Sequence, residues 1–147
     1  MLLTAVHPDL VVTSEEGVPQ LMVEVKSGKD MTVVAAEWHR QAATYDTSCF
    51  LLFVATDKFW LWAPATATPV YEGDTVLLLE RYINLEKVAL TAVQGQAFDS
   101  LVYAWLGSVI FKPASTVLAL PAQRWLVETG LHPLIYRGYI QWEASLA

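Results

Sequence analysis

An almost unbroken apolar run from Cys49 to Ala55 limits the folds that this chain can adopt. A strand with apolar side chains on both faces has to be covered on both faces, as in the sheets of α/β proteins. The preceding segment, from Met31 to about Tyr45, repeats its apolar residues with helical spacing. A helix that connects two strands of one sheet indicates a right-handed crossover. We therefore predict an α/β fold in which helices flank a mixed β-sheet.

The remaining elements follow from the alternation of apolar and polar residues and from the turn residues between them. In chain order they are strands at Asp9–Thr13 and Leu21–Ser27, the helix and the buried strand, a strand at Phe59–Trp62, a loop at Ala63–Pro69, a helix or strand at Val76–Tyr82, helices at Gln96–Phe111 and Ala122–Thr129, and a strand at Tyr139–Glu143. A turn at Glu16-Gly17 makes the first two strands a hairpin. In the first helix, Asp30 is the predicted N-cap.

One face of this first helix is predicted from its spacing. Val34, Trp38, Gln41 and Tyr45 follow one another in steps of four, three and four residues, which brings them to the same side of a helix. The histidines and tryptophans outside this face have no spacing typical of a metal or base-stacking site. We expect His39 and His132 at the surface or its boundary, and Trp60, Trp62, Trp105, Trp125 and Trp142 in the core or an interface.

Composition is consistent with one globular domain. We assign residues 1–147 to it, with a motif-bearing part at 6–62 and a helical C-terminal part at 75–147. Apolar residues make up 54% of the chain, enough for a core and for a buried interface, so we expect a homodimer. The net charge of −6 argues against strong non-specific affinity for nucleic acid, because such affinity needs many Lys and Arg contacts to phosphate.

Several features indicate a cytoplasmic protein that does not enter the membrane. The single cysteine, Cys49, excludes an intrachain disulfide and a cysteine-based zinc site, and we expect it in the core. Met1–Val6 has neither the basic region nor the apolar run of a secretory signal. The apolar stretch Leu101–Phe111 is shorter than the roughly 20 residues that cross a bilayer.

The candidate site lies on the predicted hairpin. A turn at Glu16-Gly17 places Asp9 directly across from Glu24, so that both carboxylates can hold one cation. Residues two apart on a strand share a face, which brings Lys26 beside Glu24. Carboxylates with a nearby lysine are the parts of a Mg²⁺-dependent phosphodiesterase, and the Val25 carbonyl is a further possible ligand.

These residues resemble the signature of a known superfamily. Pro8-Asp9, a hairpin-length gap and Glu24-Val25-Lys26 are similar to the motif of the PD-(D/E)XK nucleases, whose fold is restriction-endonuclease-like. Gln41-Ala-Ala-Thr-Tyr45 resembles the Gln-x-x-x-Tyr helix motif of the RecB-type branch. The resemblance covers about Val6 to Trp62.

The resemblance implies a function and a role for each motif residue. Asp9 and Glu24 would bind Mg²⁺ or Mn²⁺, Lys26 would be catalytic, and Gln41 with Tyr45 would line the site or contact DNA. The implied activity is hydrolysis of phosphodiester bonds, with DNA as the expected substrate. Endo- and exonucleolytic cleavage, and an RNA substrate, stay open.

The chain also departs from the family's pattern. Such nucleases usually have a helix, often with a third acidic ligand, and a further strand before the aspartate. Only Met1–His7 precedes the Pro8-Asp9 motif, so we expect a fold that lacks the N-terminal helix and first strand. A fragment, a different start site and a short homologue that completes its sheet through a partner are three explanations. His7 is a further candidate ligand.

Other interpretations of the same residues remain open. The chain can be a catalytically inactive relative that keeps the fold as a binding or dimerisation module. A carboxylate-pair glycoside hydrolase is a weaker alternative, because Lys26 would oppose the protonated carboxyl that such an enzyme needs. Glu24 and Lys26 can also be a surface ion pair, which contributes little to stability. Gln41 and Tyr45 can be an ordinary helix face that half-packs against the sheet.

Overall fold

A six-stranded mixed sheet forms the centre of the computed structural model, which describes residues 8–46, 48–82 and 95–142. The order across the sheet is β5-β4-β3-β2-β1-β6. The strands are β1 (Leu10–Thr13), β2 (Pro19–Lys26), β3 (Phe50–Ala55), β4 (Lys58–Trp62), β5 (Tyr71–Asp74) and β6 (Tyr139–Trp142). The α/β class with a mixed sheet is therefore confirmed.

Strand pairing follows the predicted connections. β1 and β2 form an antiparallel hairpin, while β2 and β3 are parallel because helix α1 (Thr32–Tyr45) lies between them in the chain. β4 pairs back on β3, and β5 on β4, in antiparallel fashion. On the other side, β6 pairs antiparallel with β1. A strand from the C-terminal part of the chain thus occupies the position next to the first described strand.

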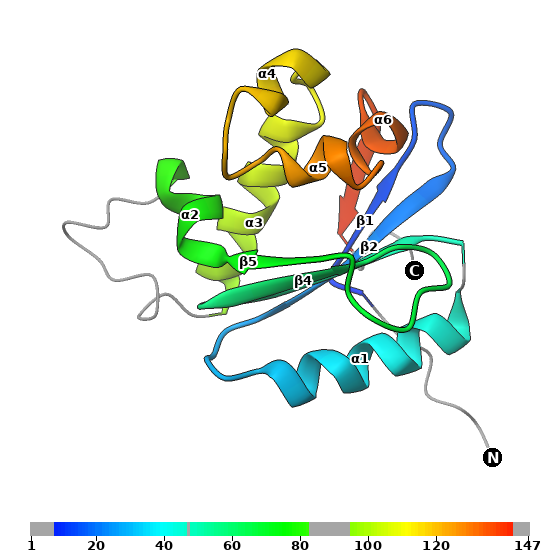
Figure 1. Ribbon diagram of the computed structural model, residues 1–147, viewed down its shortest axis with the longest axis vertical. Coiled ribbons are helices and arrows are strands. Elements are labelled where there is room, and N and C mark those ends of the chain that lie inside the picture. The colour runs from blue at the N-terminus through cyan, green and yellow to red at the C-terminus, as the bar shows by residue number, and fades with distance from the viewer. Residues whose placement is uncertain (1–7, 47, 83–94, 143–147) are drawn as a thin grey trace.

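The helices cover both faces of the sheet, as Figure 1 shows. Of the helices in the described ranges, α1 alone lies on one face. The elements on the other face are α2 (Thr75–Leu79), the 3₁₀ helix η1 (Glu80–Tyr82), α3 (Gln96–Val109), α4 (Ala114–Leu118), α5 (Trp125–Glu128) and α6 (His132–Ile135). The helices on both faces bury all six residues of β3, as the apolar run predicts.

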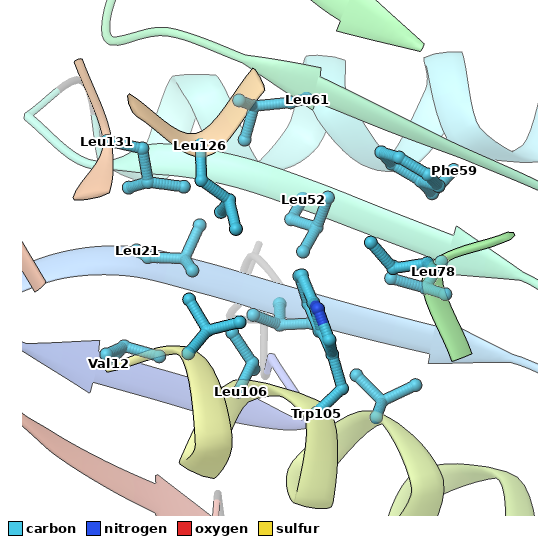
Figure 2. Close-up of a cluster of buried hydrophobic side chains, with 14 of the residues drawn as sticks. Val12, Leu21, Leu52, Phe59, Leu61, Leu78, Trp105, Leu106, Leu126 and Leu131 are labelled. Carbon is cyan, nitrogen blue, oxygen red and sulfur yellow. The ribbon is translucent and has the colours of Figure 1, made fainter. Parts of the chain in front are cut away.

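Strand alternation divides the core into two clusters. The larger cluster lies between the sheet and α3, α5 and α6, and Figure 2 shows Trp105 and Leu106 of α3 directed at the sheet near Leu21 and Leu52. The smaller cluster lies under α1, where the Trp38 ring is 5.9 Å from the ring of Phe53. Both faces of the sheet therefore bury apolar surface, and burial of this kind stabilises the fold by about 25 cal/mol per Å².

Helix α1 packs through a different face from the predicted one. Trp38 is buried, but its buried neighbours are Ala35, His39 and Ala42, whereas Gln41 and other predicted members are exposed. Small alanines on either side of Trp38 let the helix approach the sheet closely, and His39 is buried because its ring stacks on Trp62. The prediction of His39 at the surface or its boundary is therefore wrong.

Several local predictions also need correction. His132 is 2% exposed, and its ring nitrogen lies 2.8 Å from the Lys112 carbonyl oxygen. Asp30 is not the N-cap of α1: it has a φ of 57°, and Met31 occupies the cap position. The C-terminal helix predicted at Ala122–Thr129 shortens to α5, preceded by turns. The short elements β5, α4 and α6 were not predicted.

The Trp residues named above are buried, apart from Trp142, which is half-buried. Cys49 is 1% exposed, and burial, with the charge of Asp46 as a lesser cause, raises the pKa of its thiol to about 11. Both findings confirm that these side chains serve the core. Among the described residues, no helix is long and apolar enough to cross a membrane.

The contact between β1 and the turn before β6 can be tested at Gly138. A Cβ atom there would lie 1.8 Å from the Thr13 carbonyl oxygen and 2.9 Å from that of Ile135, and neither backbone atom can move aside easily. Gly138→Ala should therefore lower the free energy of unfolding by about 1–3 kcal/mol or more. Urea denaturation followed by circular dichroism measures the change.

Gly107 provides the matched control. It lies inside α3, and a Cβ atom there would have no heavy atom within 4 Å. Gly107→Ala should raise the free energy of unfolding by up to about 1 kcal/mol, because alanine favours the helix more than glycine does. Equal effects of the two substitutions would contradict the close approach of β1 to Gly138.

Candidate metal and catalytic site

Asp9 directly precedes β1, at the end of the hairpin that is remote from its turn. The register pairs Leu10 with Val23, and one further step places Asp9 opposite Glu24, as the hairpin predicts. The Asp9 side chain turns back to the ladder, where its Oδ2 atom accepts a hydrogen bond of 2.7 Å from the Val25 N–H. A side-chain oxygen thus replaces the backbone carbonyl that would continue the ladder, and this bond fixes the direction of the carboxylate.

Glu24 and Lys26 lie on the face of the sheet that α1 covers. Their neighbour two residues earlier, Met22, packs into the cluster under α1, whereas Val23 and Val25 belong to the opposite cluster. Glu24 is half-buried and Lys26 is exposed. The alternation therefore places the carboxylate and the ammonium on one face, near the carboxyl end of β2.

A second aspartate, Asp99, lies close to Asp9. It is half-buried in the first turn of α3, on the other face of the sheet. Burial raises the pKa of the Asp99 carboxyl above its ordinary value, and the negative charge of Asp9 raises it further. Two carboxylates that repel one another are thus held near each other at the end of the β1–β2 pair.

The start of α3 is tied to the end of β2, which explains this approach. The Gly95 N–H donates a hydrogen bond of 2.9 Å to the Ser27 hydroxyl oxygen, directly before the helix begins. Asp99 has no distinctive signal in the sequence, because an acid in the first turn of a helix is common as a partner of the helix dipole. Its proximity to Asp9 depends on the tertiary fold alone.

Gln41 and Tyr45 lie in the second half of α1. Along the helix axis, Gln41 lies about 14 Å and Tyr45 about 20 Å from Thr32, the first residue of the helix. Since α1 returns the chain from the carboxyl end of β2 to the start of β3, these two residues lie toward the end of the sheet that is remote from Asp9. Gln41 is exposed and donates to Glu37 Oε1 over 3.2 Å, and Tyr45 is 63% exposed.

The arrangement brings together only part of the predicted set. Asp9, the Val25 backbone and Asp99 are close, and Glu24 with Lys26 lies across the hairpin. Within residues 8–46, 48–82 and 95–142, no three Asp, Glu, His or Cys side chains are grouped in a way that could hold a metal ion. His7, the further candidate ligand, lies outside the described residues.

Burial of Asp99, and as a lesser cause the negative charge of Asp9, predicts a pH-dependent gain of stability in Asp99→Asn. Because the folded state raises the pKa of this carboxyl, the folded protein holds its proton more tightly than the unfolded chain does. Asp99 therefore reduces stability as the pH rises above about 4, and it has no such effect at lower pH. The variant should exceed the wild type in free energy of unfolding at about pH 7 and match it at about pH 3.

Urea denaturation over this pH range measures the difference. Glu16→Gln is a matched control, since Glu16 is exposed in the hairpin turn and its removal should change little. In an Asp9→Asn background the gain should shrink, because one of the two causes of the raised pKa is gone. A loss of stability in Asp99→Asn at pH 7 would contradict the repulsion.

Asp9 and Asp99 thus lie near one end of the β1–β2 pair, and we call this place the acidic centre. Comparison of the chain with family models, curated proteins and solved structures gives no match. Function therefore has to be inferred from these residues and from the motifs that they form.

Proposed function

We propose that the chain is a Mg²⁺- or Mn²⁺-dependent phosphodiester hydrolase that acts on nucleic acid, with DNA as the substrate. The observation that carries this proposal is the hairpin register, which puts Asp9 opposite Glu24, with Lys26 on the same face as Glu24. Asp99 lies near Asp9 and adds negative charge at the same end of the β1–β2 pair. Hard divalent cations prefer carboxylate oxygens, water and phosphate oxygens as ligands.

Each residue has a chemical role in this proposal. Asp9 and Glu24 would hold the cation, which would lower the pKa of bound water and polarise a phosphate when one is present. The bond from the Val25 N–H orients Asp9, and the Val25 carbonyl points to the same side of the strand, where it can serve as a further ligand. The exposed Lys26 ammonium would support the attacking water and stabilise charge on phosphorus.

The arrangement of elements also supports a restriction-endonuclease-like fold. Nucleases of this superfamily usually have a helix, often with a third acid, and a strand before the aspartate, and we expect the chain to lack both at that position. Here α3, with Asp99, and β6, which pairs antiparallel with β1, come later in the chain. We infer that they take these two places in a changed chain order. Gln41 and Tyr45 would contact the nucleic acid outside the metal site.

An inactive relative is the second candidate, and one observation favours it. The described residues hold no group of three potential metal ligands, so the acids can serve folding without binding a cation. In that case the chain is a binding or dimerisation module. The two candidates differ in their response to metal and in their activity.

Metal binding is tested by calorimetric titration of the wild type with Mn²⁺ and Mg²⁺. We expect binding in the millimolar range or tighter, and an affinity at least about tenfold lower in Asp9→Ala, which loses one charged ligand. Glu15→Ala is the control, since Glu15 is an exposed acid in the hairpin turn and should leave the affinity unchanged. Absence of a binding isotherm would favour the inactive module.

Catalysis is tested by cleavage of plasmid and single-stranded DNA with added Mg²⁺. Lys26→Ala should reduce the cleavage rate by about a hundredfold or more, as expected for a group that stabilises charge in the transition state. Lys29→Ala is the matched control, because Lys29 is an exposed lysine of the following loop. Equal rates in the wild type and Lys26→Ala would rule out the proposed mechanism.

A further inference from the structure

The central sheet has two edges, and they differ in charge. β5 forms one edge, and two of its four residues are the acids Glu72 and Asp74. β6 forms the other edge, and none of its four residues, Tyr139–Trp142, is charged. Proteins commonly protect an edge strand with charged side chains, because its unpaired backbone N–H and C=O groups can pair with another chain. β5 has this protection, whereas β6 lacks it.

The outer edge of β6 is open within the described parts of the chain. Across residues 8–46, 48–82 and 95–142, β1 is the one strand that pairs with β6. Tyr139 is 58% exposed, and Gln141 is exposed as well. A further extended strand can therefore add to β6 and continue the sheet.

Helix α3 runs antiparallel to β6 and widens this surface. At one end, the Tyr103 ring stacks on Trp142, with ring centroids 5.0 Å apart and an interplanar angle of 7°. At the other end, the Arg137 N–H donates a hydrogen bond of 2.7 Å to the Ile110 carbonyl oxygen. The residues that accompany Tyr103 on the accessible side of the helix are uncharged, namely Ser100, Gly107 and Phe111. We call β6 and this side of α3 the β6–α3 surface.

Charges of opposite sign lie at the two ends of the β6–α3 surface. Lys112 and the exposed Arg137 lie at one end, where α3 stops and β6 starts. Asp99 lies at the other end, one helical turn before Tyr103, and Asp9 is close to it. A partner with the same surface in the opposite direction would therefore set its acidic end against the basic end.

We propose that the β6–α3 surface joins two copies of this chain in a twofold-symmetric dimer. β6 would pair antiparallel with β6 of the second copy, so that the two six-stranded sheets become continuous. Antiparallel pairing fits a twofold axis, because the same strand supplies both sides of the contact. The uncharged centre avoids repulsion between two chains of net charge −6, and the oppositely charged ends attract one another.

The oligomeric state of the full chain is measured by sedimentation velocity over the micromolar range of protein concentration. The wild type should form a dimer. Gln141→Lys should weaken this dimer at least about tenfold, because the twofold axis would bring the two new ammonium groups close together on the paired edge strands. Gln41→Lys is the matched control: it makes the same exchange at an exposed position of α1 and should leave the dimer unchanged.

Gly107→Glu distinguishes loss of the dimer from loss of the fold. A Cβ atom at Gly107 would have no heavy atom within 4 Å, and glutamate favours a helix more than glycine does. Urea denaturation of the dilute monomer should therefore show a fold at least as stable as the wild type. The dimer should nevertheless weaken at least about tenfold, because like charges would enter the centre of the β6–α3 surface.

Three results would each overturn the proposal. One is a wild type that stays monomeric over the whole concentration range. Another is a dimer that Gln141→Lys and Gln41→Lys weaken equally. The third is a dimer that Gly107→Glu leaves unchanged.

Discussion

The complete burial of β3 is the constraint on which the rest of the structure depends. None of its six residues is more than 6% exposed, so both faces of the sheet need cover along this strand. α1 provides it on one face, and the helices from the second half of the chain provide it on the other. Without both layers, this strand would expose a continuous apolar surface to water.

The two layers also determine where polar groups meet. A parallel β2–β3 pair requires a crossover, and α1 therefore starts at the carboxyl end of β2, near Lys26. α3 has to cover the opposite face, and its first turn comes to the same end of the sheet through the bond between Gly95 and Ser27. The acidic centre is thus a product of sheet topology: one aspartate belongs to the hairpin and the other to the covering helix.

The hairpin and the buried strand could be predicted because their signals are local. Alternation and a Glu16-Gly17 turn determine the register, and an apolar run such as Cys49–Ala55 fits only a strand covered on both faces. Short elements such as α4 and α6 could not be predicted, because helices of four or five residues depend on tertiary packing more than on their own sequence.

The candidate site could also be predicted where its signals are local, but not where it depends on tertiary packing. The opposition of Asp9 and Glu24 follows from the hairpin alone. Asp99 approaches Asp9 only through the packing of a helix far along the chain, and no local pattern encodes that contact. The buried face of α1 depended on stacking between His39 and Trp62, a contact with a strand that comes later in the chain. Periodicity indicates that a helix has an apolar side. It does not say which side is buried when apolar residues occur on more than one side of the helix.

The pairing of β1 with β6 has a consequence for the order of folding. The β1–β2 hairpin joins residues close in sequence, so it can form early, whereas β6 must arrive from the other end of the described chain. Contacts of large sequence separation form late, because the intervening chain loses much conformational entropy when they close. A nascent chain would therefore carry an acidic hairpin with one open edge, and Asp9 would meet Asp99 only in the last stage of folding.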